Sequence, residues 1–391
     1  MELTTSKQEN RLMAATLFAF FVSGASSVLL GNLMPYLRET YGFSYAQQGL
    51  LLSLPSWGNV ASIFLTGYLP TFIGRRRTVL LTAVWMCVAY AVFTTGFGGT
   101  ALLGVACLMT GIARGGNNNF CNTMMSTLPG RKSAIGYNLL HGAFAMGAVL
   151  SPLALIACTG AREGGWRMMT GGIVVLCLCQ LLLYFKMRLP AENITKSIKK
   201  VDRSFLKNRN FWLGAMILFF YISAEYAIVN WLVTYFKDTG ILSDRVSQLM
   251  SSLLWVVIFI GRMIGAVLVG RVARKYILLA DGVGMLCFFL LVFFSRSELP
   301  IFIGIMGIGL FMATIYTSAM ALGIEDIRGN DLGVSTMTLI GSTGGIITPA
   351  VVGLVAERAG IQTGMGVVVA VTVILLAAII LSVRYSTDTD I

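Results

Sequence analysis

The sequence has few charged residues and a single histidine. Of its 391 residues, 12% are Asp, Glu, Lys or Arg, about half of the ~25% that soluble domains carry. Hydrophobic residues make up 56%, and they recur in about twelve stretches of roughly 20 residues, the length that crosses a bilayer as a helix. This composition excludes an ordinary soluble domain. It predicts an all-α membrane protein with about twelve transmembrane helices.

Several kinds of chemical site are also missing from the sequence. The seven cysteines lie within or at the ends of apolar stretches, so we interpret them as buried side chains without a disulfide framework. His141 has no second His, Cys or carboxylate at ligand spacing, which argues against a metal site. We find no phosphate-binding Gly-Lys-Ser loop and no nucleophile motif. We therefore expect no metal, no cofactor and no enzymatic activity.

The net charge of +12 reports membrane topology and does not indicate nucleic-acid binding. About twenty of the cations fall on alternate loops, and the positive-inside rule then places both termini and the long middle loop on the cytoplasmic side. We expect the membrane to be a cell (inner) membrane. The cations assigned to the cytoplasmic side are Lys7, Arg11, Arg75 to Arg77, Arg131, Lys132, the group from Lys186 to Arg209, Arg271, Arg274, Lys275, Arg328 and Arg384.

The predicted spans fall into two groups of six. They cover 11–37, 44–72, 77–97, 100–128, 134–159 and 166–187, and then 210–237, 245–272, 276–294, 299–323, 331–357 and 362–384. The longest polar segment lies between the two groups. We therefore predict an N-terminal six-helix bundle at residues 1–187, a cytoplasmic linker at 188–209 and a C-terminal six-helix bundle at 210–391.

The two halves repeat glycine and proline positions at offsets close to half the chain length. The matched positions are Gly58 with Gly261, Gly67 with Gly270, Gly147 with Gly344, and Pro152 with Pro349. Two parallel repeats related by an axis along the membrane normal are an architecture of secondary transporters, which hold their substrate near the bilayer midplane.

The segment from Gly67 to Arg77 resembles a known family. It reads Gly67-Tyr-Leu-Pro-Thr71-Phe-Ile-Gly74-Arg75-Arg-Arg77 and is similar to the signature loop of the major facilitator superfamily. Thr71 stands where that signature has Asp, so the family's charge relay at this loop does not carry over intact. The resemblance implies two pseudo-symmetric six-helix bundles that transport a small solute by alternating access.

Other segments most resemble the fucose permease-like sugar:proton symporters within that superfamily. They are Asn138 to Pro152, Ala224-Glu225, Gly261-Arg262 and Gly344 to Pro349. This resemblance implies proton-coupled uptake of a monosaccharide or a related polar solute by a monomer surrounded by membrane lipids. Two alternatives stay open: an organic-acid or sugar-acid symporter, and a drug:proton antiporter. A receptor or lipid scramblase that transports no solute is the alternative from a different class.

Glu225 is the acid that we place near the middle of a span, in the seventh. Ionisable residues at that depth are expensive and usually face a cavity or pair with a cation. Its charge can respond to solute and to access state, as proton coupling requires, although a permanent salt bridge between helices is the alternative. His141 is the second predicted proton-coupling residue, because histidine titrates near neutral pH; hydrogen-bonded packing on its helix is the alternative.

Polar residues on the fourth span suggest a solute site. Arg114, Asn118 and Asn122 recur at helical spacing and place amides and a guanidinium on one helix face. We predict that they bind solute, and that Arg114 pairs with Glu225 from the opposite half; Arg262 in the eighth span is the alternative partner. The remaining predicted solute-binding residues are Tyr226, Asn230, Trp57, Trp231, Arg262 and Tyr316, chosen because sugars stack on aromatic faces and bond to amides.

The cytoplasmic loops suggest a gate. We predict that Gly67, Gly74 and Arg75, Arg76 and Arg77 form it. Together with Arg131 and Lys132, these arginines would pair with the acids Glu325, Asp326 and Asp331 of the second half and separate when that side opens. Asp281 is predicted to form a charge pair with the cations that precede the ninth span, Arg271, Arg274 and Lys275.

Overall fold

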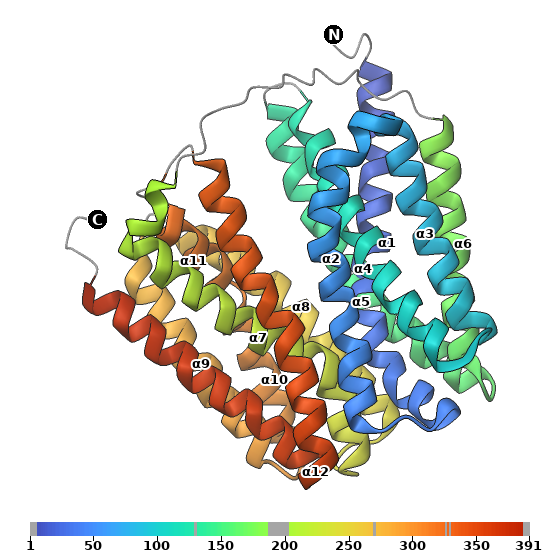
Figure 1. The fold of residues 1–391 in the computed structure, drawn as a ribbon. Helices are drawn as coiled ribbons and strands as arrows, with labels where there is room; N and C mark the ends of the chain where they lie inside the picture. The colour runs from blue at the N-terminus through green and yellow to red at the C-terminus, as the bar shows by residue number, and fades with distance from the viewer. Residues whose placement is uncertain are drawn as a thin grey trace. The chain divides into compact units, whose positions relative to one another are not determined.

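The computed structural model describes residues 6–128, 131–186, 203–268, 271–324, 327 and 330–385. Nearly all of them are helical (Figure 1). The elements are α1 Ser6–Tyr41, α2 Tyr45–Ile73, α3 Arg75–Thr95, α4 Gly99–Ser126, α5 Arg131–Ala161, α6 Gly165–Lys186, η1 Ser204–Lys207, α7 Arg209–Asp238, α8 Asp244–Leu268, α9 Arg274–Phe294, α10 Glu298–Met312, α11 Ile315–Ile324 and α12 Asp331–Tyr385.

The helices account for the predicted number of spans. Within the described residues, 11 helical stretches are long and apolar enough to cross a membrane, and α10 with α11 form one of them. The last is α12, whose 55 residues would reach about 80 Å as one helix. Gly360 interrupts it with φ 82° and ψ 159°, a conformation that glycine adopts without strain. The arms 331–359 and 361–385 are therefore two spans, and the prediction of a twelve-helix membrane fold is confirmed.

Contacts divide the chain into two compact units. Unit 1 contains residues 1–41 and 54–197, and unit 2 contains residues 42–53 and 198–391. The division cuts α2: its first turns, residues 45–53, belong to unit 2 together with the preceding residues 42–44. Most of the predicted linker, up to residue 202, lies outside the described residues.

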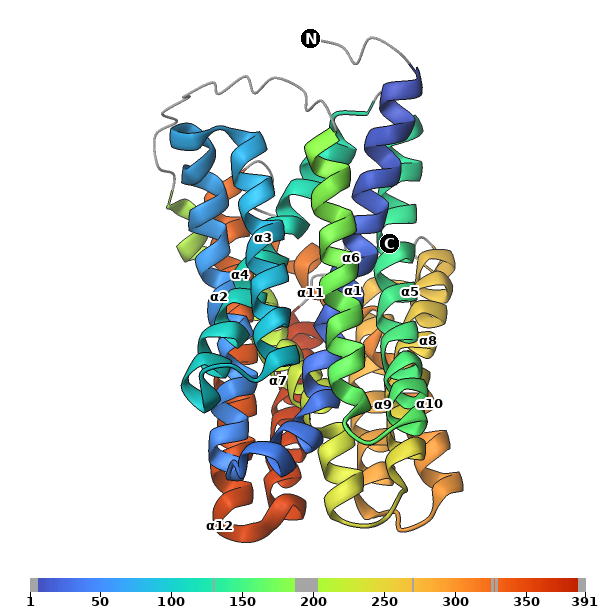
Figure 2. The same cartoon turned by 90° about the vertical axis from the view of Figure 1, so that its right-hand side faces the viewer.

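Unit 1 is a helical bundle with a continuous apolar core. Helix α1 packs along α5, and α3 packs between α4 and α6 (Figure 2). The core gathers side chains from all of these helices, including Phe20 on α1, Val79 on α3, Met124 on α4, Leu140 on α5 and Tyr184 on α6. Each of α1, α3, α4, α5 and α6 therefore contributes buried side chains to this core.

Unit 2 packs in a similar way. Helix α7 lies against α12 and α11, while α9 contacts α10 and α12 and α8 contacts α10. Figure 1 shows the two arms of α12 as antiparallel helices joined at a turn. Helix α7 is the most enclosed of these elements, because most of its residues from Phe211 to Phe236 are buried.

The repeated glycines mark equivalent helix contacts in the two units. A Cβ atom at Gly58 on α2 would lie 2.2 Å from the carbonyl oxygen of Leu108 on α4. A Cβ atom at Gly261 on α8 would lie 2.9 Å from the carbonyl oxygen of Leu310 on α10. Each glycine thus lets a span approach the second span after it in the sequence, as small residues do in membrane helices.

The second pair of glycines repeats another contact. A Cβ atom at Gly147 on α5 would lie 2.1 Å from the carbonyl oxygen of Phe21 on α1. A Cβ atom at Gly344, on the first arm of α12, would lie 2.4 Å from the carbonyl oxygen of Phe219 on α7. Since both glycine pairs join corresponding spans, the internal repeat is a repeat of packing. Gly270, the match of Gly67, lies outside the described residues.

Candidate functional site

A cluster of ionisable side chains surrounds Glu225 in unit 2. Glu225 and Tyr221 are four residues apart on α7, which puts them on one helix face, and the Tyr221 hydroxyl is hydrogen-bonded to the Glu225 carboxylate. Arg262 on α8 interacts electrostatically with the same carboxylate. The predicted alternative, in which Arg262 accompanies Glu225, therefore agrees with the geometry of this unit.

Tyr316 completes this group from α11. Its ring meets the Tyr221 ring edge-on, with centroids 6.4 Å apart at 65°, and its hydroxyl interacts electrostatically with Glu225 and Tyr226. We call Tyr221, Glu225, Arg262 and Tyr316 the Glu225 cluster. Three separate helices thus bring a carboxylate, a guanidinium and two phenols together, a set that can hold a proton and bond to a polar solute.

The neighbouring predicted residues of α7 differ in accessibility. Tyr226 is partly exposed, and Asn230 is buried. Trp231 is fully buried, and its indole N–H donates to the carbonyl oxygen of Pro349 at 3.2 Å. The Trp231 side chain thus joins α7 to the first arm of α12.

The polar residues of α4 bond mainly within unit 1. Arg114 donates from Nη1 to Ser27 Oγ at 2.8 Å, and Asn118 Oδ1 accepts from Ser23 Oγ at 2.9 Å. Asn122 donates from Nδ2 to the carbonyl oxygen of Asn118, one turn earlier in the same helix. Pairing of Arg114 with Glu225, which belongs to unit 2, stays a prediction.

Asn117, which precedes Asn118 and is not among the predicted site residues, is the buried centre of this polar region. Its Nδ2 donates to the carbonyl oxygen of Ala19 at 3.0 Å and to Ser23 Oγ at 3.2 Å. Its Oδ1 accepts from Gln180 Nε2 at 3.0 Å and from the Tyr184 hydroxyl at 2.9 Å. Asn117 therefore connects α4 to α1 and α6. The available signal was its position on the helix face of Cys121, one turn later, and Met124, two turns later, which both lie in the apolar core.

Two further predicted residues lie on exposed positions. Trp57 on α2 is 55% exposed. His141 on α5 is exposed, and its ring meets Phe20 edge-on with centroids 6.0 Å apart.

The predicted gate residues lie around the junction of α2 and α3: Gly67 is in α2, Gly74 separates the two helices, and Arg75 to Arg77 begin α3. Gly74 has φ 82° and precedes the first residue of α3. Arg76 donates from Nη2 to the carbonyl oxygen of Phe185 at 2.6 Å and lies 5.5 Å from the centre of that ring, so it is bound to the end of α6. Arg75 is partly exposed and Arg77 is exposed. Glu325 and Asp326 and the side chain of Asp331 lie outside the described residues, so cross-half pairing stays a prediction.

Lys132, which was expected to share this gate, has a partner in unit 1. Its Nζ lies 2.5 Å from Glu9 Oε2, and this contact ties the start of α5 to α1. Lys132 is exposed, so the pair contributes about 1 kcal/mol or less.

The first turn of α2 is held within unit 2 by polar contacts that the sequence did not predict. Glu357 Oε2, on the first arm of α12, accepts from the backbone N–H groups of Tyr45 at 2.8 Å and Ala46 at 3.4 Å. A carboxylate at a helix N-terminus is favoured by the helix dipole. The Tyr45 hydroxyl also donates to Asp238 Oδ2 at 2.9 Å, and Gln48 Nε2 donates to the Thr234 hydroxyl at 2.9 Å. We call residues 42–53 the α2 head.

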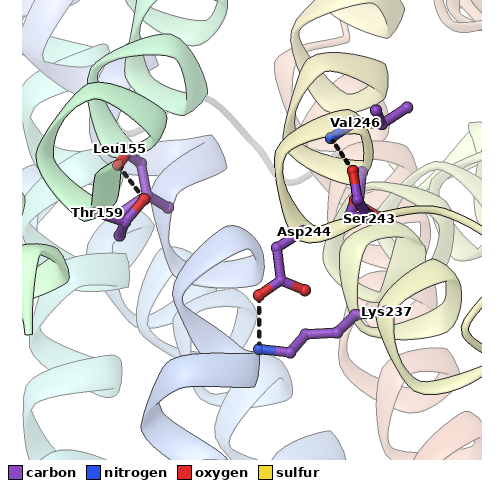
Figure 3. A network of polar contacts seen from close by, with 7 residues as sticks. Leu155, Thr159, Lys237, Ser243, Asp244 and Val246 are labelled. Atoms are coloured by element: carbon purple, nitrogen blue, oxygen red, sulfur yellow. Dashed lines mark hydrogen bonds and ion pairs between the residues drawn. The ribbon is translucent and has the colours of Figure 1, made fainter. Parts of the chain in front are cut away.

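Figure 3 shows an ion pair at the turn between α7 and α8. Lys237 Nζ lies 3.1 Å from Asp244 Oδ2, and the two side chains are 18% and 51% exposed. Ser243 Oγ accepts from the backbone N–H of Val246 at 3.4 Å and caps the start of α8. Such an exposed pair contributes about 1 kcal/mol or less.

The prediction that Asp281 forms a charge pair with the cations before the ninth span is wrong. In the part of the chain that the structure describes, Asp281 is 7% exposed and its Oδ2 accepts from the hydroxyl of Thr314. No ion pair with Arg271, Arg274 or Lys275 forms among these residues. Asp281 is therefore a second carboxylate inside the spans of unit 2.

A hollow of about 670 Å³ in unit 1 is separate from all of these groups. It is lined by the end of α1 and the turn between α5 and α6, including Glu39, Arg162, Glu163, Trp166 and Arg167. None of the predicted site residues lines it. We therefore do not assign it to the solute site.

Comparison with known proteins places this architecture in a family. Residues 16–339 match the model of the Major Facilitator Superfamily. A Helicobacter pylori protein named as a candidate glucose/galactose transporter is 23% identical over 383 residues and covers 90% of each chain. A gallate transporter of Pseudomonas putida is 24% identical over 389 residues, covering 85% of this chain and 82% of the relative.

A solved structure is also similar in fold. The structure of a D-xylose–proton symporter aligns with a TM-score of 0.78 at 14% identity, covering 98% of this chain and 99% of that chain. The twelve spans, the repeated glycine contacts and the family match agree with the resemblance seen in the sequence. The chain is a multi-pass membrane protein that belongs to the Major Facilitator Superfamily of transporters.

Proposed function

We propose that this chain takes up a monosaccharide or a related small polar solute together with protons. The observation that carries the proposal is the Glu225 cluster, in which the Glu225 carboxylate bonds to Tyr221 and lies near Arg262 and Tyr316. Ionisable groups inside spans mark solute and proton pathways. A carboxylate with one cation and two phenols around it can exchange its proton while the phenols and guanidinium keep the site polar.

The proposed transport cycle is alternating access between two bundles, residues 1–187 and 210–391, joined by a cytoplasmic linker at 188–209. Both termini would lie in the cytoplasm, and the protein would reside in a cell (inner) membrane as a monomer. Arg114, Asn118 and Asn122 would contribute to solute binding from the first bundle. Arg75, Arg76 and Arg77 would contribute to the cytoplasmic gate.

A second candidate function is uptake of a small organic acid. Arg262 supports it, because a guanidinium inside the site can bind a carboxylate in a two-point geometry. The relative from Pseudomonas putida is named for gallate, which is a carboxylate. In this case the Arg262 guanidinium would bind the solute carboxylate. The solute would be released when the guanidinium pairs with Glu225 instead.

Uptake by proteoliposomes distinguishes these functions. The imposed gradient is alkaline inside, and the probes are radiolabelled glucose, galactose, xylose and gallate. For one proton per solute, a gradient of about one pH unit supports up to about tenfold accumulation. We expect a neutral sugar to accumulate only with the gradient. Glu225→Gln is expected to exchange that sugar without concentrating it.

Asp244→Asn is the matched control, because it also removes one carboxylate but only from the exposed pair with Lys237. It should accumulate sugar as the native protein does. Full proton dependence of the Glu225→Gln protein would refute the role of Glu225. Uptake of gallate alone, lost in Arg262→Lys, would favour the organic-acid function.

A further inference from the structure

Asp281 lies inside a span of unit 2 but outside the Glu225 cluster. It is seven residues after the start of α9, which is about 10 Å along the helix axis. Its carboxylate is 7% exposed, and within the described residues its one hydrogen bond comes from the hydroxyl of Thr314. A carboxylate without a cation at this depth is costly when ionised, and acids retained in spans usually serve a function.

Thr314 occupies the break in the tenth span. Helix α10 ends at Met312 and α11 begins at Ile315, so Thr314 lies in the two-residue turn between them. On its other side the Thr314 methyl group packs against Gly265 of α8, where an added Cβ would lie only 2.2 Å from it. The hydroxyl and the methyl group thus hold the break between α9 and α8.

The break adjoins the Glu225 cluster. Tyr316, a member of the cluster, follows Thr314 by two residues on α11. On α8, Gly261 packs against Ala313 of the break, with an added Cβ 2.7 Å from the Ala313 Cβ, and the next residue is Arg262. A change in the break would therefore shift Tyr316 relative to Tyr221.

We propose that Asp281 is a protonatable positioning residue that controls the break between α10 and α11 and thereby the position of Tyr316. The inference rests on the proposed proton-coupled function. When Asp281 is charged, its bond from Thr314 is charge-assisted and roughly twice as strong as a neutral one. When Asp281 takes up a proton, that bond weakens and the break opens more often.

No other charged group of the surrounding helices competes for Asp281 in the described part of the chain, because none forms an ion pair or hydrogen bond with it. Among the described side chains, the other charged and titratable groups on α9 and on the elements near it are Arg274, Lys275, Tyr276 and Cys287 on α9, Glu298 on α10, Tyr316 on α11, Glu357, Arg358, Arg384 and Tyr385 on α12, and Asp244, Arg245 and Arg262 on neighbouring α8.

Hydrogen–deuterium exchange of the full-length purified protein tests this inference without knowledge of the solute. The measured quantity is the protection factor of peptides that cover residues 310–318, corrected for intrinsic exchange, at about pH 5 and about pH 8. We expect protection in the native protein to be about fivefold lower at the acidic pH, the factor for a charge-assisted bond becoming neutral. Asp281→Asn should show low protection that no longer depends on pH.

Matched variants separate this role from simple packing. Thr314→Val keeps the shape but loses the hydroxyl, so it should lose the pH dependence, and Thr314→Ser should retain it. Asp244→Asn should behave as the native protein. If Asp281→Asn does not fold, the comparison of Thr314→Val with Thr314→Ser tests the inference.

A fivefold pH dependence that persists in Asp281→Asn or in Thr314→Val would overturn the inference. Glu225→Gln should keep the pH dependence of the break even where it abolishes accumulation of solute. The two proposals therefore fail in different measurements: the proposed sugar uptake fails in the accumulation of solute, and the inference fails in the pH dependence of exchange at the break.

Discussion

Asn117 is the residue whose replacement should destabilise unit 1 most among the polar residues of α4. Its side chain is 4% exposed and bonds to Ala19 and Ser23 on α1 and to Gln180 and Tyr184 on α6. Asn117→Ala removes all four of these hydrogen bonds. It also leaves the Gln180 amide and the Tyr184 hydroxyl without that acceptor in a buried region.

The expected loss follows from the number of bonds. Hydrogen bonds between membrane helices contribute about 0.6 kcal/mol on average and up to about 1.7 kcal/mol, and stranded buried donors add to the cost. We expect Asn117→Ala to lower the free energy of unfolding by about 2–4 kcal/mol. Asn122→Ala is the control on the same helix. Because the Asn122 side chain bonds to the backbone of its own helix, it should lose about 0.5 kcal/mol or less.

Reversible unfolding of the purified protein by SDS in mixed micelles, followed by circular dichroism, measures both variants. The difference between Asn117→Ala and Asn122→Ala is the quantity of interest, since it cancels the general effect of removing an amide from α4. Equal losses in the two variants would refute the assignment of Asn117 as the centre that joins three helices. A loss below about 0.5 kcal/mol in Asn117→Ala would do the same.

Four substitutions test other contacts. Gly353→Ala places a Cβ 2.4 Å from a carbonyl oxygen of the α2 head. It should lower the free energy of unfolding by about 1–3 kcal/mol and raise the hydrogen exchange of residues 45–50. Gly172→Ala is the control, because nothing lies around that position, and it should leave this exchange unchanged. Glu357→Gln should weaken the cap of α2 by about 0.3–1 kcal/mol, seen as faster exchange of residues 45–48. Gly74→Ala, at φ 82°, should lower the thermal midpoint through a strain of about 1–2 kcal/mol. Asp244→Asn should change the free energy of unfolding by less than about 1 kcal/mol at any salt concentration.

The spans and the repeat could be predicted because both are properties of local sequence. Apolar length fixes a span, and Gly58 and Gly261 occupy equivalent positions because each must let two backbones approach closely. The division of α2 could not be predicted in this way. Its first turns join unit 2 through Tyr45, Gln48 and Glu357, and the residues that bond there are about 190 and 310 positions apart in the chain.

The roles of the asparagines on α4 also needed the structure. Helical spacing grouped Asn118 and Asn122 with Arg114 on one face, and that grouping is geometrically correct. It could not show that the adjacent Asn117 points between α1 and α6, since the sequence does not say which helices cover which face. Asn117, which has the most hydrogen-bond partners, therefore lies beside the predicted polar face and not on it.

Asp281 shows how sequence proximity and spatial proximity differ on a helix. Arg274 and Lys275 precede it by seven and six residues, which places them about 9–10 Å away along the axis, beyond the 4 Å at which an ion pair forms. They therefore belong to the polar end of α9, while Asp281 lies two turns deeper. The group that meets its carboxylate is Thr314, 33 residues later, because the break after α10 turns that hydroxyl toward α9. The same break carries Tyr316 to Tyr221, so Asp281 and Glu225 are connected through one short turn of the chain.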